Sequence, residues 1–333
     1  MEKREGLPFI SVVVPIYNEE LVLPKFIETM SGVLKQVSEE FEIVFAADPC
    51  QDRTLEIVRE AHAQDPRIKL LALSRRFGQP AATMAGLAYA RGQVVVVIDC
   101  DMQDPPGLIP EMVKFWREGY KVVIPQRRSR TGEHPLKKLI AYSGYWFINK
   151  IANVKIPRNT GDFRLMDRRI VSELVKLNES HGFLRGLVAV VGFKTYLLPF
   201  DREARDAGEG KYNRITGSLR IGFNGIVAFS DYLLNLASMA GFCISAFAVV
   251  AILVILTMKL GDMLGYFSWK FESGIPSVMI LILFMGGLQM MSMGILGAYI
   301  GRIYDEAKRR PKFIVEESVG LDGEFRKRRS DDV

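Results

Sequence analysis

The chain has 333 residues, with 44 lysines and arginines against 38 aspartates and glutamates, so its net charge is +6. This length accommodates one large domain or two smaller ones. The three cysteines, at positions 50, 100 and 243, lack the spacing of a metal site or a disulfide framework, and their pattern excludes both classes. A basic protein can bind nucleic acid, but no basic–aromatic platform or known motif supports that class, so we expect no nucleic-acid partner.

The first part of the chain alternates short β-branched runs with helical patterns. We expect strands at 9–15, 41–46, 68–73, 94–98 and 120–125. Helical patterns lie between them, at 21–37, 54–63, 80–90 and 108–117. This alternation predicts an α/β fold with a mostly parallel sheet and helices on both faces. Further on the pattern is less regular, and we expect a loop, two helices and a mostly extended segment at 126–138, 139–152, 170–177 and 188–200.

Two acids follow the apolar strand predicted at 94–98. Asp99 and Asp101 lie on the same side if the strand's period of two persists. Strand ends are where open α/β sheets bind their ligands. Two carboxylates aimed at one point repel each other unless a cation lies between them, and hard oxygen ligands favour Mg²⁺ or Mn²⁺. A solvated acidic turn is the competing interpretation of this short pattern.

Several separated blocks occur in a fixed order. They read VVPIYNEE at 13–20, DPCQDRT at 48–54, SRRFGQ at 74–79, DCDMQDPP at 99–106, GDFRLMDR at 161–168, FLRG at 183–186 and GKY at 210–212. In this combination, over about residues 9–300, the chain resembles glycosyltransferase family 2 enzymes with a GT-A (Rossmann-like) fold. The resemblance is strongest to the polyisoprenyl-phosphate glycosyltransferases, which include dolichyl-phosphate mannose synthase-like and bactoprenol glucosyltransferase proteins.

The resemblance implies roles for the acids. Asp101 is implied as a direct metal ligand with a catalytic role, and Asp99 as a ligand of the ribose or of the same metal. Gln103 is implied to assist the diphosphate or the metal. Asp162 is implied as a catalytic or sugar-positioning carboxylate, with a salt bridge to Arg164 as the competing interpretation.

The resemblance also implies a set of substrate-binding residues. On the nucleotide side these are Pro15, Tyr17, Glu19 and Asp48. The block at 48–54 departs from the family pattern, since Ala47 and Pro49–Cys50 replace an acid or amide and a Gly-Ser pair, so the base remains open. Five basic residues are also expected to meet phosphate groups; they are Arg128, Arg164, Arg185, Arg205 and Lys211. Structural roles for Arg164 and Arg185, and a solvated loop for the run that contains Arg128, are the competing interpretations.

Two apolar stretches dominate the C-terminal part. Neither 233–258 nor 273–301 contains Asp, Glu, Lys, Arg or His, and each exceeds the roughly 20 residues that a membrane-spanning helix needs. Two buried helices of a soluble domain are the competing interpretation. The basic residues after position 301 predict, by the positive-inside rule, that this end is cytoplasmic. We therefore expect a multi-pass protein of the inner or plasma membrane, with its catalytic domain and both termini in the cytoplasm.

The expected organisation has six parts. They are a GT-A catalytic domain at 1–214, an amphipathic interface helix at 215–231, a transmembrane helix at 232–258, an extracytoplasmic loop at 259–274, a second transmembrane helix at 275–301 and a basic tail at 302–333. Small residues in the second span allow close helix packing and a possible homo-oligomer.

The expected reaction is inverting transfer of a hexose from a nucleotide sugar to a polyprenyl phosphate, with a divalent cation. Glucose from UDP-glucose is the first choice. GDP-mannose-dependent mannosyl transfer is an alternative, as is a processive or protein-directed transferase. A further alternative is an inactive membrane protein that binds a nucleotide sugar.

Overall fold

The computed structural model describes residues 8–128, 157, 159–177, 184–200, 232–264 and 274–321. Within them the strands form one eight-stranded sheet in the order β7-β5-β6-β4-β1-β2-β3-β8. The strands are β1 (Ile10–Ile16), β2 (Phe41–Ala47), β3 (Ile68–Leu73), β4 (Val94–Val97), β5 (Val122–Arg127), β6 (Arg164–Asp167), β7 (Thr195–Phe200) and β8 (Val315–Val319).

Most neighbouring strands run parallel, which confirms the predicted sheet. β1 pairs in parallel with β2 and β4, β2 with β3, and β5 with β7. The antiparallel members are β6, which lies between β4 and β5, and β8, which lies beside β3. The strand order reverses between β1 and β4, and this is where open α/β sheets form a ligand crevice.

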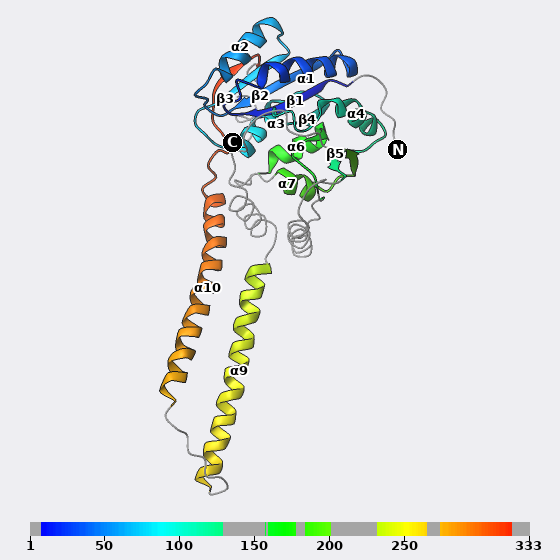
Figure 1. Ribbon diagram of the computed structural model, residues 1–333. Coiled ribbons are helices and arrows are strands. Elements are labelled where there is room, and N and C mark those ends of the chain that lie inside the picture. Colours follow the sequence, from blue (N-terminus) through cyan, green and yellow to red (C-terminus); the bar gives the residue numbers. More distant parts are fainter. Residues whose placement is uncertain are drawn as a thin grey trace.

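Helices cover both faces of the sheet (Figure 1). The helical elements are α1 (Leu23–Val37), α2 (Thr54–Gln64), α3 (Gln79–Tyr89), η1 (Pro106–Leu108), α4 (Ile109–Arg117), α6 (Arg168–Lys176), α7 (Leu184–Val191), α9 (Tyr232–Met263) and α10 (Ile275–Ala307). α1, α2 and α4 pack on one face, whereas α3, α6 and α7 pack on the other. The four helices predicted between the first five strands are therefore all present.

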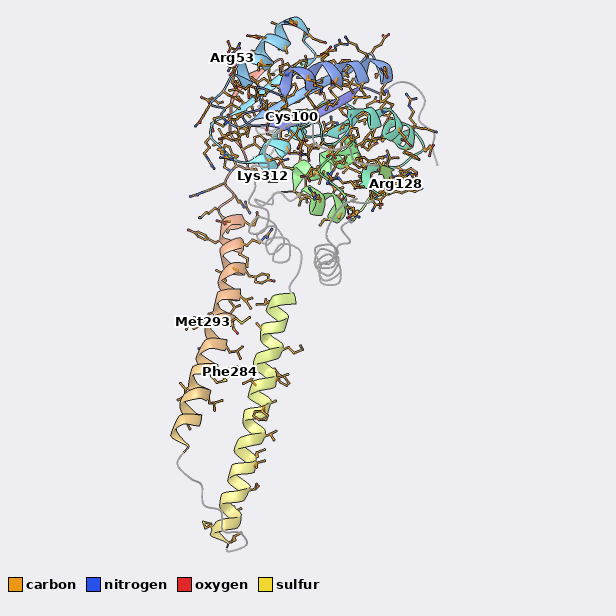
Figure 2. The ribbon with its side chains drawn as sticks, in the orientation of Figure 1. Arg53, Cys100, Arg128, Phe284, Met293 and Lys312 are labelled. Carbon is orange, nitrogen blue, oxygen red and sulfur yellow. The ribbon has the colours of Figure 1, made fainter. Side chains whose placement is uncertain are left out.

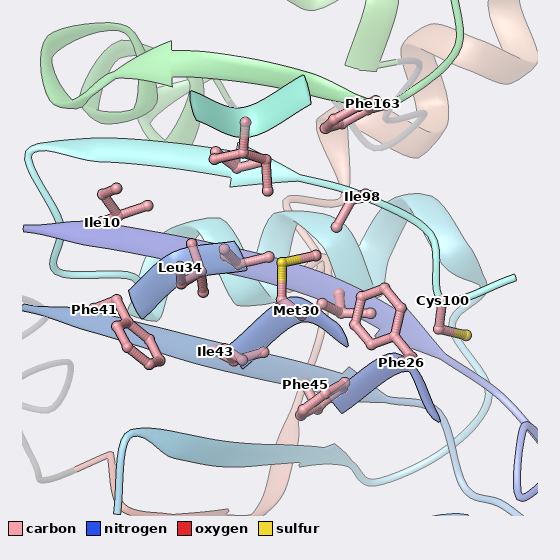
Figure 3. Close-up of a cluster of buried hydrophobic side chains, with 14 of the residues drawn as sticks. Ile10, Phe26, Met30, Leu34, Phe41, Ile43, Phe45, Ile98, Cys100 and Phe163 are labelled. Atoms are coloured by element: carbon pink, nitrogen blue, oxygen red, sulfur yellow. The ribbon is translucent and has the colours of Figure 1, made fainter. Parts of the chain in front are cut away.

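The core explains why both faces are covered. Val12 and Val14 of β1 join the cluster under α1 and α4, whereas Val13 joins the cluster under α3, because successive side chains of a strand alternate. Figure 3 shows Phe26, Met30 and Leu34 of α1, spaced four residues apart on one face of the helix. All three are fully buried, and each contributes about 1.5–3 kcal/mol of transfer free energy.

The segment 188–200 differs from its prediction. It was expected to be mostly strand, but α7 continues to Val191 and β7 begins only at Thr195. Leu184, Leu187 and Val188 are buried at positions i, i+3 and i+4, which is helical spacing.

The chain returns to the sheet after α10. β8 pairs with β3, and Leu321 is buried in the cluster that contains Leu71 and Leu73. The Arg59 guanidinium on α2 donates two hydrogen bonds to the Glu317 carboxylate, at 3.0 and 2.6 Å. Only a basic tail was predicted here, so β8 is an addition that the sequence analysis missed.

α9 and α10 lie side by side and extend away from the sheet (Figure 1). Phe284 and Met293 are among the large apolar side chains exposed along α10 (Figure 2). Yet in the part of the chain that the structure describes, no helix combines the length and apolar character needed to cross a membrane. By this criterion the prediction of two transmembrane helices in a multi-pass protein of the inner or plasma membrane is wrong.

The interface helix predicted at 215–231 lies outside the described residues. So do the helix predicted at 139–152 and most of the loop predicted at 126–138.

Candidate active site

The carboxyl ends of adjacent parallel strands gather the predicted blocks. Tyr17 follows β1, Asp48 follows β2 and Asp99 lies two residues beyond β4. β1 lies between β2 and β4 in the sheet, so these three loops open onto the same edge. This topology therefore brings the three blocks together at one edge.

The acidic turn after β4 concentrates negative charge. Asp99 is half-buried and accepts a hydrogen bond from Gln79 Nε2 at 2.8 Å. Burial, the largest cause, and the negative charges of Asp162, Asp101 and Asp104 together raise the pKa of Asp99 to about 7. The Asp99 carboxylate is therefore held where its negative charge is unfavourable.

Asp101 has the opposite environment. Its side chain is exposed, and its Oδ1 accepts a hydrogen bond from the Gln103 backbone N–H at 3.1 Å. Met102 between them has φ of 56°, in the left-handed region, so the chain turns sharply here. Gln103 contributes its backbone to this contact, which fixes the turn around Asp101.

The two carboxylates fit part of a divalent cation site. A cation between Asp99 and Asp101 would offset the charge repulsion at Asp99, and carboxylate oxygens suit Mg²⁺ or Mn²⁺. Among the described residues, no three His, Cys, Asp or Glu side chains gather closely enough to hold a metal ion. Mg²⁺ commonly takes one or two carboxylates, with substrate phosphates and waters as further ligands, so the donor set is compatible with that arrangement.

Asp162 is held by Arg185 more closely than by its predicted partner. Arg185 donates Nε to Asp162 Oδ1 at 2.8 Å and Nη2 to Oδ2 at 3.3 Å, whereas Arg164 Nη2 lies 3.7 Å from Oδ1. Burial alone would raise the pKa of Asp162. The charge and hydrogen bonds of Arg185, with the charge of Arg164, outweigh burial and hold that pKa below its ordinary value. Asp162 therefore stays ionised near neutral pH.

Arg164 has a fully buried side chain in β6. It donates Nε to the Asp162 backbone oxygen at 3.1 Å and Nη2 to the Gly161 backbone oxygen at 2.9 Å. Burial lowers the pKa of Arg164 to about 10, with the Asp162 charge opposing this shift and that of Arg185 adding to it. These contacts place Arg164 beneath the Gly161–Asp162 backbone, which it holds in position.

Asp48 also makes contacts that position backbone. It is buried, and its two carboxylate oxygens accept hydrogen bonds from the backbone N–H groups of Phe77 and Gly78, at 3.0 and 2.9 Å. Gly78 has φ of 90°, which favours glycine, and it precedes α3. Asp48 thus fixes the loop that carries Gln79, the hydrogen-bond partner of Asp99.

The loops after β1 and β2 are joined to each other. Glu19 donates its backbone N–H to Thr54 Oγ1 at 2.8 Å, and Asn18 Oδ1 accepts from the Gln51 backbone at 2.9 Å. The Arg76 guanidinium lies 4.2 Å from the centre of the Tyr17 ring. An aromatic ring and an exposed cation therefore meet at the same sheet edge.

The remaining predicted residues are divided between the described and undescribed parts. Pro15 is buried within β1, opposite Ala46 of β2, so it belongs to the strand itself. Arg128 is exposed just after β5. Arg205 and Lys211 lie outside the described residues.

The sequence analysis assigned no role to three residues at this edge, Arg76, Gln79 and Asp104, although they stand inside the blocks already singled out. Arg127 lies in the loop predicted at 126–138, and its ion pair with Asp104 was not expected. Their contacts join different blocks, so local sequence carried no signal for the pairing.

Comparison with known proteins identifies the family of this chain. A family profile described as "Glycosyl transferase family 2" matches residues 11–175. A Bacillus subtilis (strain 168) protein named "Uncharacterized glycosyltransferase YkcC" is 42% identical over 312 residues, which covers 94% of each chain. The chain belongs to glycosyl transferase family 2. The expected family and the α/β GT-A-like fold are thereby confirmed.

Another family 2 relative carries a more specific name. The "Prophage bactoprenol glucosyl transferase homolog" of Escherichia coli (strain K12) is 36% identical, covering 92% of this chain and 98% of the relative. Among solved structures, this family 2 chain is similar to glucosyl-3-phosphoglycerate synthase from Mycobacterium tuberculosis, in complex with Mn²⁺, uridine-diphosphate-glucose and phosphoglyceric acid. That similarity has a TM-score of 0.43 at 19% identity, over 66% of this chain and 78% of the other.

Proposed function

We propose that this chain transfers glucose from a nucleotide sugar to a polyprenyl phosphate. The observation that carries the proposal is that the acidic turn after β4 lies beside the segment that leads to Asp162. An ideal Cβ on Gly161 would lie 3.3 Å from Asp104 Oδ2 of that turn, and Arg185 holds the next residue, Asp162. Relatives named bactoprenol glucosyl transferase, at 36% identity over most of both chains, support the sugar and the lipid. UDP-glucose is the proposed donor.

Asp99 and Asp101 are the proposed ligands of a divalent cation, Mg²⁺ or Mn²⁺. When bound, such an ion stabilises the negative charge that develops on a leaving diphosphate. The side chain of Gln79 donates a hydrogen bond to Asp99, and the backbone N–H of Gln103 donates one to Asp101. In this proposal the chain holds the carboxylates of Asp99 and Asp101 close to each other at the edge of the sheet.

Asp162 is the proposed sugar-positioning carboxylate. Arg185 and Arg164 keep it ionised, so its negative charge can stabilise positive charge developing at the anomeric carbon and can accept a hydrogen bond from a sugar hydroxyl. A bidentate arginine also limits rotation of the carboxylate. Asp162 therefore acts by position and charge.

The acceptor phosphate is already anionic near neutral pH, so a strong general base is not required and correct positioning can dominate the rate. An acceptor oxygen forms the new bond to the anomeric carbon as the bond to the leaving diphosphate breaks on the opposite side. The electron pair of the broken bond leaves with the nucleoside diphosphate. A single displacement of this kind inverts the anomeric configuration. Arg128, Arg205 and Lys211 are the proposed contacts of the acceptor phosphate.

The test is a donor panel with the full-length protein. Labelled UDP-glucose, UDP-galactose and GDP-mannose are incubated separately with polyprenyl phosphate and Mg²⁺, and the products are partitioned into chloroform. We expect a chloroform-soluble labelled product from UDP-glucose, which is lost on chelation of the metal. A labelled polymer or the absence of product from every donor would contradict the proposal, whereas product from GDP-mannose alone would correct the donor.

A homo-oligomer is the proposed assembly. Gly294, Gly297 and Gly301 of α10 have open space where a Cβ would stand, which permits close approach of another helix. Light scattering coupled to size-exclusion chromatography tests this: a mass of two or more chains is expected, and a single-chain mass at micromolar concentration would contradict it.

A further inference from the structure

A partly buried ion pair bridges two loops of the candidate site. Arg127 Nη2, at the end of β5, donates to Asp104 Oδ1 at 3.3 Å. Asp104 is only 8% exposed and belongs to the same turn as Asp99 and Asp101. β5 and β4 are separated in the sheet by β6, so the pair reaches across the end of β6.

The segment that enters β6 passes beside this pair. A Cβ placed on Gly161 would lie 3.3 Å from Asp104 Oδ2 and 3.5 Å from Arg127 Nη2. The first distance is closer than ordinary van der Waals contact, so the pair lies almost directly on the Gly161 backbone. Asp162, the proposed sugar-positioning carboxylate, is the next residue.

The backbone of the same segment is fastened to β5. Arg127 donates its backbone N–H to the Asn159 oxygen at 3.1 Å, and Gln126 forms an isolated bridge with Thr160. The Arg164 guanidinium donates hydrogen bonds to the backbone oxygens of Gly161 and Asp162. Asp104 is therefore the contact that joins this fastened segment to the acidic turn.

We propose that Asp104 is a positioning residue: its ion pair with Arg127 sets the distance between the Asp99–Asp101 turn and the segment that carries Asp162. The inference rests on the proposed function, because only a transfer reaction makes that distance matter. The two loops hold opposite sides of the reaction, one the leaving diphosphate and the other the sugar. A misplacement of about 1 Å between such groups can lower turnover by about 10²-fold.

The experiment compares two variants with a matched control in the full-length protein. Asp104→Ala removes the carboxylate of the ion pair, which belongs to the acidic turn. Gly161→Ala adds a Cβ that would crowd the same pair from the segment that carries Asp162. Gly107→Ala is the control, because a Cβ on Gly107 meets nothing within 4 Å. For each, kcat, the KM for UDP-glucose and the affinity for UDP with Mg²⁺ are measured.

We expect both test variants to lose about 10²-fold in kcat, with the affinity for UDP and Mg²⁺ kept and Gly107→Ala unchanged. Unaltered kcat in Asp104→Ala would overturn the inference. A loss of UDP affinity in parallel with kcat would also overturn it, since Asp104 would then act on the metal site itself.

Hydrogen exchange tests the positioning role of Asp104 independently of whether the proposed function is correct. In Asp104→Ala the amides of 159–164 should exchange faster, while those of β2 stay protected. Unchanged exchange in 159–164 overturns the inference even if the wild-type protein transfers sugar. If the amides of 159–164 exchange faster in Asp104→Ala but the wild-type protein transfers no sugar, the result counts against the proposed function alone.

Discussion

The two halves of the sheet fix their loops in different ways. In the parallel half, β3-β2-β1-β4, side chains hold loops through backbone N–H groups, as Asp48 does with Phe77 and Gly78. In the mixed half, β6-β5-β7, arginine–carboxylate pairs do so, as with Asp162 and Arg185. Backbone hydrogen bonds fix a shape, whereas ion pairs also set the charge of the site. Changes in the first half should therefore alter stability, and changes in the second should alter turnover and its pH dependence.

The largest effect is expected where the halves meet, at the acidic turn. Asp101→Ala should lower kcat by about 10³-fold, because a proposed metal ligand is lost while the leaving group still needs charge stabilisation. The fold should survive, since Asp101 is exposed. Steady-state rates with Mg²⁺ check this, with Glu111→Ala on α4 as an exposed acidic control. Equal rates in the Asp101 variant and the wild-type protein would remove Asp101 from the metal site.

Arg185→Ala tests the mixed half. Without the charge and hydrogen bonds of Arg185 the pKa of Asp162 rises, although the charge of Arg164 still opposes the effect of burial. A larger fraction of Asp162 is then protonated at acidic pH than in the wild-type protein. We expect kcat to fall by about 10²-fold and the acidic limb of the pH–rate profile to shift to higher pH. Arg185→Lys should restore part of both. A uniform loss of rate with an unshifted acidic limb would show that Arg185 does not act through the charge of Asp162.

Asp48→Asn tests the parallel half. The amide would turn its NH₂ group toward one of two backbone N–H donors, and a buried unpaired donor costs about 1–3 kcal/mol. Denaturant unfolding should show this loss. The matched control is Asp65→Asn, which weakens the partly exposed pair with Arg67 and should cost under about 1 kcal/mol. A stability equal to that of the wild-type protein would mean that the loop at 74–78 is held by other contacts.

The smallest effect is expected at β8. Glu317→Gln removes an exposed pair with Arg59, worth about 0.2–1 kcal/mol. The hydrogen bond from Arg59 lowers the pKa of Glu317 below its ordinary 4.5. The pair therefore stabilises the fold above that pH, and its contribution is lost as the pH falls through the lowered pKa.

Unfolding free energies of Glu317→Gln and Glu316→Gln at pH 7 and pH 3 check this, with the exposed Glu316 as the control. The difference between the variants should appear at pH 7 and shrink at pH 3. A difference that persists at pH 3 would exclude the ion pair as its cause.

The same contrast explains which parts of the fold and of the candidate site could be predicted from the sequence. The parallel half was predictable because each strand is a short, mostly apolar run and each functional block begins at or near the end of a strand. Asp99 and Asp101 were placed at a strand end for that reason, whereas Tyr17 and Asp48 were singled out by the resemblance to the family. The run of valines at 94–97 predicts a strand without knowledge of any tertiary contact.

The rest depends on contacts between distant positions. The partner of Asp162 is Arg185 of α7, and the partner of Asp104 is Arg127 at the end of β5, so each pair joins separate elements. The second pair also depends on the placement of β6 between β4 and β5. β8 meets α2 through residues 258 positions apart. The apolar stretches were long, but apolar content alone did not establish membrane spans, and that prediction failed against the described helices.

The central claim is that the acidic turn after β4 serves glucosyl transfer to a polyprenyl phosphate. Mass spectrometry of the lipid fraction tests it most directly, after full-length wild-type and Asp101→Ala proteins are incubated with UDP-glucose, polyprenyl phosphate and Mg²⁺. The account predicts a lipid heavier than the acceptor by one hexose with the wild-type protein, and at most a trace with the variant. Equal product from both proteins, or none from the wild-type protein with any donor, would contradict it.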